Sequence, residues 1–371
     1  MTPSTGLRPA ATSATDANAL FDDDFPHLLV HTRADRLDLV APVCASENLG
    51  AVVCVSPRSA NHVLTDLAKR YVASGAAPSA LMLDADRYRG KKRAYGATEM
   101  SSTWVRMQTN LGIAHPLTNS GYIPTGDIKA LRAVLRATEK MGRHVVAALP
   151  VANEFLTRDL GDLIDEVNAA GVAIGLMVEH KDDPFGARKN VSGLIELLER
   201  AEVPVLLLRC DLSIVGALAW GARSGAFGTS TSLRHIYPIG KGGGGGHIPS
   251  VSAIVKDTLS LTRLDKIDDA IHRLPDPMWS CPCTTCYGRS LDWMATEDQA
   301  FQHSLAIVSV LVDEVLDDNL TSSRRRELWR GMCHTAQFRA LELDSETGGA
   351  WGNAPKFLGA WVAQAIESTT V

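Results

Sequence analysis

Three cysteines and one histidine form the clearest set of potential metal ligands in this sequence. Cys281, Cys283 and Cys286 fall within six residues, in the pattern Cys-x-Cys-x-x-Cys. His303 follows 17 positions after Cys286, inside an apolar periodic segment. Three thiolates and one imidazole are a ligand set of closed, tetrahedral zinc sites. The spacing therefore predicts a structural Zn2+ site. His334 is a more distant alternative fourth ligand, and a cluster of buried thiols without metal is the alternative to the site itself.

Acidic side chains at the ends of apolar segments are the second group that could do chemistry. Asp84, Glu179 and Asp211 each end or follow a short apolar run. Carboxylates can act as a nucleophile, a general acid or base, or a hydrogen-bond acceptor. Each also has a structural alternative: Asp211 would cap the helix that follows it, and the other two would form ion pairs. These ion pairs would join Asp84 to Arg87, and Glu179 to Lys181 or Arg209.

Two further polar positions are candidates for substrate binding. Arg209 lies two residues before Asp211, and its side chain would point either into the barrel or into the same region as Asp211, where its charge could keep that carboxylate ionised. Ser230 belongs to the run Thr229–Ser232, whose hydroxyls and backbone amides could hold a phosphate. An ordinary strand end is the alternative for this run.

The elements that must position these residues follow a regular alternation. Short apolar runs rich in β-branched residues alternate with amphipathic helical segments, and their starts lie 22 to 35 residues apart. The eight runs span residues 27–32, 51–56, 80–84, 115–121, 144–151, 172–179, 203–210 and 225–232. Continuous apolar strands are typical of parallel sheets covered on both faces. The pattern predicts an α/β protein, a (β/α)8 TIM barrel with a C-terminal zinc-binding helical subdomain.

The helical segments carry their own end signals. One apolar stripe ends at Gly142, a second at Gly171, and a third before Pro204. An open doubly wound sheet is the alternative fold. It usually has a glycine-rich turn after its first strand, and this sequence has none there.

Three regions are expected along the chain. Residues 1–20 are a flexible leader, residues 21–238 the barrel, and residues 239–371 a glycine-rich linker, the zinc-binding unit and C-terminal helices. The linker contains five consecutive glycines, Gly242–Gly246. This run lacks the spacing of a P-loop, so a hinge is favoured over a loop that wraps a phosphate.

Composition and charge limit the function classes. The formal net charge of −5 gives no overall positive field, so nucleic-acid binding would need a local basic patch. The candidates for such a patch, with a solvated helix face as the alternative for the run 324–326, are Arg289, Arg324, Arg325, Arg326, Arg330, Lys91, Lys92 and Arg93. The scattered remaining cysteines suit a reducing compartment. With no long apolar run and no signal peptide, the sequence predicts a cytoplasmic protein that binds no membrane.

Several motifs together resemble the tRNA-guanine transglycosylase family. The cysteines of the zinc motif and His303 match that family's metal ligands. Further similarities lie at residues 287–290 (the family's Tyr-x-Arg-Ala), 303–305 (its His-Asn-Leu), 175–179 (its Gly-Leu-Ala-Val-Gly-Glu strand) and 117–121 (its Leu-Thr-Asp-Ser-Gly-Gly-Phe). The resemblance implies a zinc-bearing barrel that exchanges bases in a nucleic acid, a pentosyltransferase. It also implies substrate-binding roles for Glu179, Asn119, Ser120 and Gly121.

The sequence departs from the family pattern at two acids. Asn119 stands where the family has the aspartate of its Asp-Ser-Gly motif, and Gly228 falls where it has its nucleophilic aspartate. An amide is no general base, and a glycine cannot attack a sugar carbon. We expect Asp211 and Asp84 to supply the missing catalytic carboxylates. The short interval between Cys286 and His303 also implies a trimmed zinc unit.

The expected function is therefore transglycosylase-like: exchange of a guanine or 7-deazaguanine base in tRNA or DNA through a covalent glycosyl intermediate. Two alternatives stay open. One is a non-catalytic transglycosylase-like partner or nucleic-acid-binding subunit, and the other is an unrelated TIM-barrel enzyme acting on a small phosphorylated ligand. The expected partners are a nucleic acid and a purine-like base, with a homodimer or heteromer as an open possibility.

Overall fold

The structure is a computed structural model, and it describes residues 21, 24–56, 58–240 and 250–365. The leader predicted for residues 1–20 and the glycine run 242–246 lie outside the described residues.

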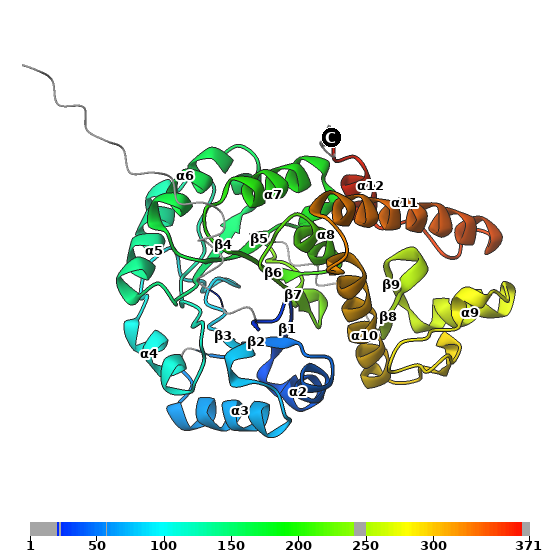
Figure 1. Cartoon of the computed structure of the whole chain (residues 1–371), viewed down its shortest axis with the longest axis horizontal. Helices are drawn as coiled ribbons and strands as arrows, with labels where there is room; N and C mark the ends of the chain where they lie inside the picture. Colours follow the sequence, from blue (N-terminus) through cyan, green and yellow to red (C-terminus); the bar gives the residue numbers. More distant parts are fainter. Residues whose placement is uncertain (1–20, 22–23, 57, 241–249, 366–371) are drawn as a thin grey trace, which may run out of the picture.

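Seven parallel strands form one curled sheet that resembles half of a barrel wall (Figure 1). The strand order is β3-β2-β1-β7-β6-β5-β4. The strands are β1 (Leu28–Arg33), β2 (Gly50–Cys54), β3 (Leu81–Asp84), β4 (Ala147–Ala152), β5 (Ile174–Glu179), β6 (Val205–Cys210) and β7 (Ser224–Gly228). Each overlaps one predicted apolar run, so seven of the eight predicted strands are confirmed.

The one remaining predicted strand, residues 115–121, does not form a regular strand, so this prediction is wrong. Within the described residues its one backbone bridge is parallel, between Leu117 and Val146 just before β4. Further along, the N–H of Gly121 donates to the carbonyl of Gly96 at 2.8 Å, so the segment pairs with a loop rather than with β3. A Cβ at Gly121 would lie 2.4 Å from the carbonyl carbon of Ala94, and this close approach needs a glycine. Within the described residues, the sheet is open between β3 and β4.

The strand order rules out the doubly wound alternative. The first strand pairs in parallel with the last strand of the sheet, with Leu28 opposite Gly225. A doubly wound sheet of the common order places a middle strand beside its first strand. The observed order is instead the cyclic order of barrel strands, interrupted at one place.

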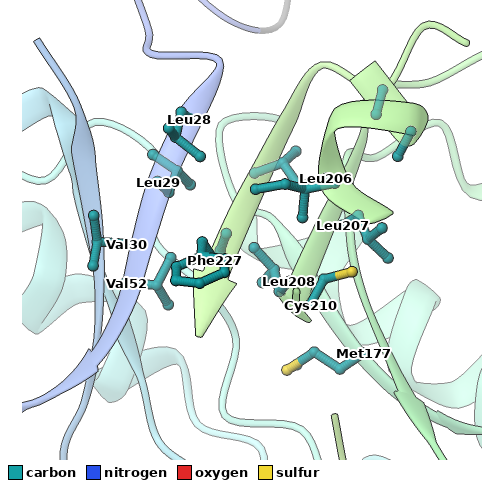
Figure 2. Close-up of a cluster of buried hydrophobic side chains, with 14 of the residues drawn as sticks. Leu28, Leu29, Val30, Val52, Met177, Leu206, Leu207, Leu208, Cys210 and Phe227 are labelled. Carbon is teal, nitrogen blue, oxygen red and sulfur yellow. The ribbon is translucent and has the colours of Figure 1, made fainter. Parts of the chain in front are cut away.

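The sheet is covered by apolar side chains on both faces. All residues of β4 and β6 are buried, as expected for parallel strands whose two faces are both covered. Figure 2 shows side chains from several strands meeting in one core, with Phe227 of β7 between the neighbouring strands. Packing therefore fixes the carboxyl ends of the strands, where the polar candidates lie.

Helices surround the outside of this sheet (Figure 1). They are α2 (Leu37–Ser46), α3 (Asn61–Ala73), α4 (Ser102–Asn110), α5 (Ile128–Met141), α6 (Leu160–Ala170), α7 (Arg188–Arg200) and α8 (Ser213–Ala219). Gly142 follows α5 and Gly171 follows α6, both with positive φ (119° and 58°), which confirms the predicted helix ends.

The C-terminal part packs against the sheet unit through α8. It contains the antiparallel hairpin β8 (Ser252–Val255) and β9 (Ser260–Arg263), and the helices α9 (Leu264–Arg273), α10 (Glu297–Leu316), α11 (Ser322–Glu346) and α12 (Lys356–Val362). Helix α10 lies between the sheet unit and the hairpin (Figure 1). A Cβ at Gly216 of α8 would lie 2.5 Å from the indole nitrogen of Trp329 and 2.6 Å from Trp361, so the helices meet at very close range.

None of the seven cysteines, all of which lie in the described residues, forms a disulfide. No helix in the described ranges combines the length and apolar character needed to cross a membrane.

Candidate active site and metal centre

The four predicted metal ligands lie together and are buried. The imidazole Nδ1 of His303 is 3.8, 3.6 and 3.1 Å from the sulfurs of Cys281, Cys283 and Cys286, respectively. All four ligand atoms lie within 4.8 Å of one another. Such spacing matches the edges of a tetrahedron around an ion bound at about 2.0–2.3 Å. The group could hold a metal ion.

Neighbouring groups prepare these side chains for a cation. The Nε2 of His303 lies 2.7 Å from the carbonyl oxygen of Ile254 and donates to it, which leaves the Nδ1 lone pair toward the sulfurs. The indole N–H of Trp293 donates to the sulfur of Cys286 at 3.2 Å. These are the outer contacts expected around a thiolate and imidazole metal site.

Local sequence explains how the ligands converge. An antiparallel bridge between Ser280 and Ser290 closes the cysteine turn. Tyr287 and Gly288 follow the third cysteine with positive φ values of 55° and 81°, which reverses the chain. His303 comes from α10, whose start is fixed by a capping box at Thr296. The alternative ligand His334 is exposed on α11 and packs against Phe338, so it lies outside the cluster.

Asp84 lies in a buried charge network at the ends of β1, β2, β3 and β6. Its Oδ2 is 3.1 Å from Nε2 of His31 and accepts a hydrogen bond from the hydroxyl of Tyr88. Arg209 lies 3.6 Å from the same oxygen and also donates to Asp86 at 2.6 Å. The predicted pair of Asp84 with Arg87 is wrong, because Arg87 binds Glu99 instead.

Charge compensation explains the ionisation of this network. Burial alone would raise the pKa of Asp84, but the hydrogen bond from His31 and the charge of Arg209 lower it below its ordinary value. Burial lowers the pKa of His31. His31, Cys54 and Asp84 also have metal-ligand geometry, with ligand atoms within 4.8 Å of one another. However, the guanidinium of Arg209 lies 3.3 Å from the sulfur of Cys54 and already supplies a positive charge there.

The side chain of Arg209 points into the buried charge network around Asp84 and not toward Asp211. It is fully buried and points to Asp84, Asp86 and Tyr88 rather than holding the carboxylate of Asp211 ionised. Its backbone has a φ of 51°, which turns the side chain at the end of β6 away from its neighbour.

Glu179 is held by two groups from the segment between β3 and β4. Arg93 donates to one of its oxygens at 2.5 Å, and the hydroxyl of Tyr122 donates to the other at 2.5 Å. The guanidinium of Arg93 also stacks on the ring of Tyr122, 3.6 Å from its centroid. The alternatives of a pair with Lys181 or Arg209 are therefore wrong.

Asn119, Ser120 and Gly121 hold backbone in place. The side-chain amide of Asn119 accepts from the N–H of Ser101 at 3.0 Å and donates to the carbonyl of Glu99 at 3.1 Å. Ser120 donates to the carbonyl of Ala148 at 2.5 Å. All three residues are buried. Their role as substrate-binding residues stays a prediction, and the observed contacts are with the protein itself.

Asp211 shares a cavity with a second acid, Asp183, which the sequence analysis missed. Both residues are partly buried and line a cavity of about 630 Å3 at the carboxyl ends of β5 and β6. Asp183 accepts from the N–H of Phe185 at 2.8 Å and Asp211 from the N–H of Ser213 at 3.2 Å. Asp211 thus accepts from the first residue of α8 with one carboxylate oxygen, although the N-cap position of this helix is Leu212. The second oxygen of each acid has no hydrogen-bond partner within the described residues.

This carboxylate pair has unusual acidity. Burial, together with the nearby charge of Asp211, raises the pKa of Asp183 to about 8. Burial also raises the pKa of Asp211, although the N–H of Ser213 and the charge of Arg234 partly oppose this. The carboxyl group of Asp183 therefore keeps its proton to a higher pH than an ordinary aspartate does. An acid in the loop after β5, four residues beyond Glu179, was the sequence signal that could have revealed Asp183.

Gly228 leaves no room for the carboxylate that the resembled family has there. A Cβ at this position would lie 2.3 Å from the carbonyl oxygen of Leu233 and 2.8 Å from the backbone nitrogen of Arg234. The chain after β7 turns over the strand end at Leu233, and this turn occupies the space. Ser230 lies in the same turn and lines a second cavity of about 670 Å3.

Most of the candidate basic patch binds protein groups. Arg289 donates to the carbonyls of Cys286 and Thr285, and Arg330 donates to the carbonyl of Val362. The other C-terminal arginines are similarly engaged, Arg324 with Glu327, Arg325 with the carbonyls of Leu316 and Asp317, and Arg326 with Glu199. Lys91 and Lys92 are exposed.

Comparison with known proteins gives little guidance. No family model matches the chain, and no curated protein matches it. A solved structure described as the citrate synthase SbnG is similar over 56% of this chain and 87% of its own length. The identity is 11% and the TM-score 0.35, and a likeness this weak supports no inference about function.

Proposed function

We propose that this chain is a transglycosylase-like enzyme that exchanges a guanine or 7-deazaguanine base in tRNA or DNA. One observation supports catalysis above the others: Asp183 and Asp211 line one cavity at the carboxyl ends of parallel strands, with raised pKa values. Enzymes with a (β/α)8 barrel have their active sites at the carboxyl ends of the strands. Paired carboxylates that share a proton are suited to breaking glycosidic bonds.

The two acids would divide the chemistry between them. Asp211 attacks the anomeric carbon of the sugar, and the bond from carbon to base breaks with its electron pair moving to the base nitrogen. Asp183, protonated near neutral pH, donates its proton to the departing base. In the second step, a nitrogen of the incoming base attacks the same carbon. The ester bond to Asp211 then breaks, and the proton of the incoming base passes to Asp183.

The proposal gives Asp84 and Glu179 supporting roles. Asp84 is paired with Arg209, is hydrogen-bonded to His31 and is remote from solvent, so it holds the ends of β1, β3 and β6 together. Glu179 is held by Arg93 and Tyr122 at the neighbouring strand end.

The proposal also includes zinc and a closed barrel. Zinc fits the donor set of three thiolates and one imidazole, which it prefers in a four-coordinate structural site. When bound, zinc would stabilise the C-terminal unit and take no part in the reaction. The barrel would be a (β/α)8 barrel in which residues 115–121 occupy the place of the fourth strand, beside β4.

A base-exchange assay tests the proposal. The protein is incubated with labelled guanine and either tRNA or double-stranded DNA, and label incorporated into the polymer is measured. We expect Asp211→Asn to lower the rate about a thousandfold or more. Asp183→Asn should lower it about a hundredfold or more, since it removes the proton donor. Asp165, which is exposed on α6 and does not line the cavity, provides a matched control, and Asp165→Asn should stay within about twofold of the parent.

A non-catalytic partner is the second candidate. The observation in its favour is that Asp84 and Glu179 are engaged by arginines, while Gly228 replaces the family's nucleophile. Full exchange activity in Asp211→Asn, or no exchange of guanine or a 7-deazaguanine in either polymer, would favour this candidate over the enzyme.

A further inference from the structure

A second cavity, of about 670 Å3, adjoins the one that contains the carboxylate pair. The two cavities share Arg234 and Leu261 in their walls. The second cavity is rich in hydroxyl groups, because the run Thr229–Ser232 after β7 lines it together with Ser250 and Ser252. Three arginines also line it, namely Arg33, Arg36 and Arg234.

Arg234 is a cation without a neutralising partner at the boundary of the two cavities. Its Nε donates to the carbonyl of Gly228 at 3.3 Å, and no carboxylate lies within ion-pair distance of it in the described part of the chain. Burial lowers the pKa of Arg234, and the charge of Asp211 only partly opposes this. A desolvated guanidinium of this kind favours the binding of an anion.

The other two arginines differ in their charge balance. Arg36 is neutralised by Glu297 and Asp298 on α10. Arg33 is exposed and contacts only the hydroxyl of Ser232, at 3.4 Å. Arg33 and Arg234 therefore contribute two positive charges to the wall of this cavity, against one exposed carboxylate, Asp35, which also lines it.

We infer that this cavity binds a phosphate group of the substrate, held by Arg33, Arg234 and the hydroxyls of the run Thr229–Ser232. The inference rests on the proposed function, because a sugar whose anomeric carbon faces Asp211 would extend its phosphate past Arg234 into this cavity. Phosphate oxygens accept several hydrogen bonds from guanidinium and hydroxyl donors. The loops after the last strands of a barrel are a frequent place for such a group. The phosphate is either a terminal monoester of a nucleotide or a phosphodiester of a nucleic acid.

Calorimetric binding to the full-length Asp211→Asn protein tests this inference without turnover. The ligands are guanosine, guanosine 5′-monophosphate, and a short guanine-containing oligonucleotide with no terminal phosphate. We expect guanosine to bind at least tenfold more weakly than one of the phosphate-bearing ligands, since a charge-assisted contact contributes about tenfold or more. Tighter binding of the monophosphate identifies a monoester site, and tighter binding of the oligonucleotide identifies a phosphodiester site.

Two substitutions locate the phosphate. Arg234→Gln should weaken the phosphate-bearing ligand by about tenfold or more and leave guanosine unchanged. If Arg234→Gln fails to fold, Arg33→Gln takes its place, because Arg33 is exposed and a substitution there is tolerated. Arg33→Gln should also weaken the phosphate-bearing ligand, but to a smaller extent. Arg132→Gln is the matched control, because Arg132 is exposed on α5 and pairs with Glu166 away from both cavities.

The inference is overturned if guanosine binds as tightly as both phosphate-bearing ligands. It is also overturned if the arginine substitutions weaken guanosine and its phosphates equally. A different result would show that only the proposed function is wrong. In that case the exchange assay would detect no base exchange, while calorimetry would still show tighter binding of the phosphate-bearing ligand and its dependence on Arg234.

Discussion

The carboxylate pair should make the stability of the protein depend on pH in an unusual direction. Asp183 has a pKa of about 8 in the folded protein, against an ordinary value of 3.8. Between these two values the folded state carries a proton that the unfolded state has lost. The free energy of unfolding therefore falls as the pH rises through this window, the opposite of the behaviour of a salt-bridged aspartate.

The magnitude follows from the width of the window. A single group contributes at most about 1.4 kcal/mol per pH unit, so about 2.7 kcal/mol between pH 5.5 and 7.5. Asp183 is partly exposed and part of its pKa shift comes from the charge of Asp211, so solvent screening reduces this figure to about 1–1.5 kcal/mol. Asp183→Asn keeps the oxygen that accepts from Phe185 but cannot titrate. Between pH 5.5 and 7.5, the free energy of unfolding of Asp183→Asn should therefore fall by about 1–1.5 kcal/mol less than that of the parent.

Urea unfolding followed by tryptophan fluorescence measures this difference. The parent, Asp183→Asn and the control Asp165→Asn are compared at pH 5.5 and 7.5 with zinc present, so that any effect of pH on the metal cancels. The reasoning is refuted if the parent and Asp183→Asn lose the same stability between the two pH values, or if Asp165→Asn matches Asp183→Asn.

Two further outcomes are expected at other positions. Elemental analysis should find about one zinc per chain in the parent and less in Cys283→Ser. In this variant the C-terminal unit should unfold before the sheet unit. Full metal retention in Cys283→Ser would contradict the assignment. Gly228→Asp should destabilise the protein by about 2 kcal/mol or more in thermal unfolding and gain no exchange activity, because its Cβ would meet the carbonyl of Leu233 at 2.3 Å; a stable and more active variant would show that the turn can move.

The zinc site and most of the sheet could be predicted from sequence because both depend on local patterns. The three cysteines lie in one tight turn, and His303 lies in a helix with its own capping box, so short-range structure already limits where the ligands can go. β4 is apolar throughout and β6 is apolar except for Arg209, since both faces of these strands are covered. Residues 115–121 have a similar composition, but their neighbour is the loop at Ala94–Gly96 rather than β3, and composition does not show that.

Tertiary structure alone decided which acids remain available for chemistry. Asp84, Glu179 and Asp211 look alike in the sequence, as acids at strand ends. Arg209 neutralises Asp84 from β6, and Arg93 reaches Glu179 from a segment 86 residues away. The left-handed backbone at Arg209 turns its guanidinium away from Asp211. Asp211 instead lines the same cavity as Asp183. A residue's own sequence context sets its charge and its strand. Its pKa and its partner depend on which distant side chains share its desolvated space, and packing of the whole chain determines that.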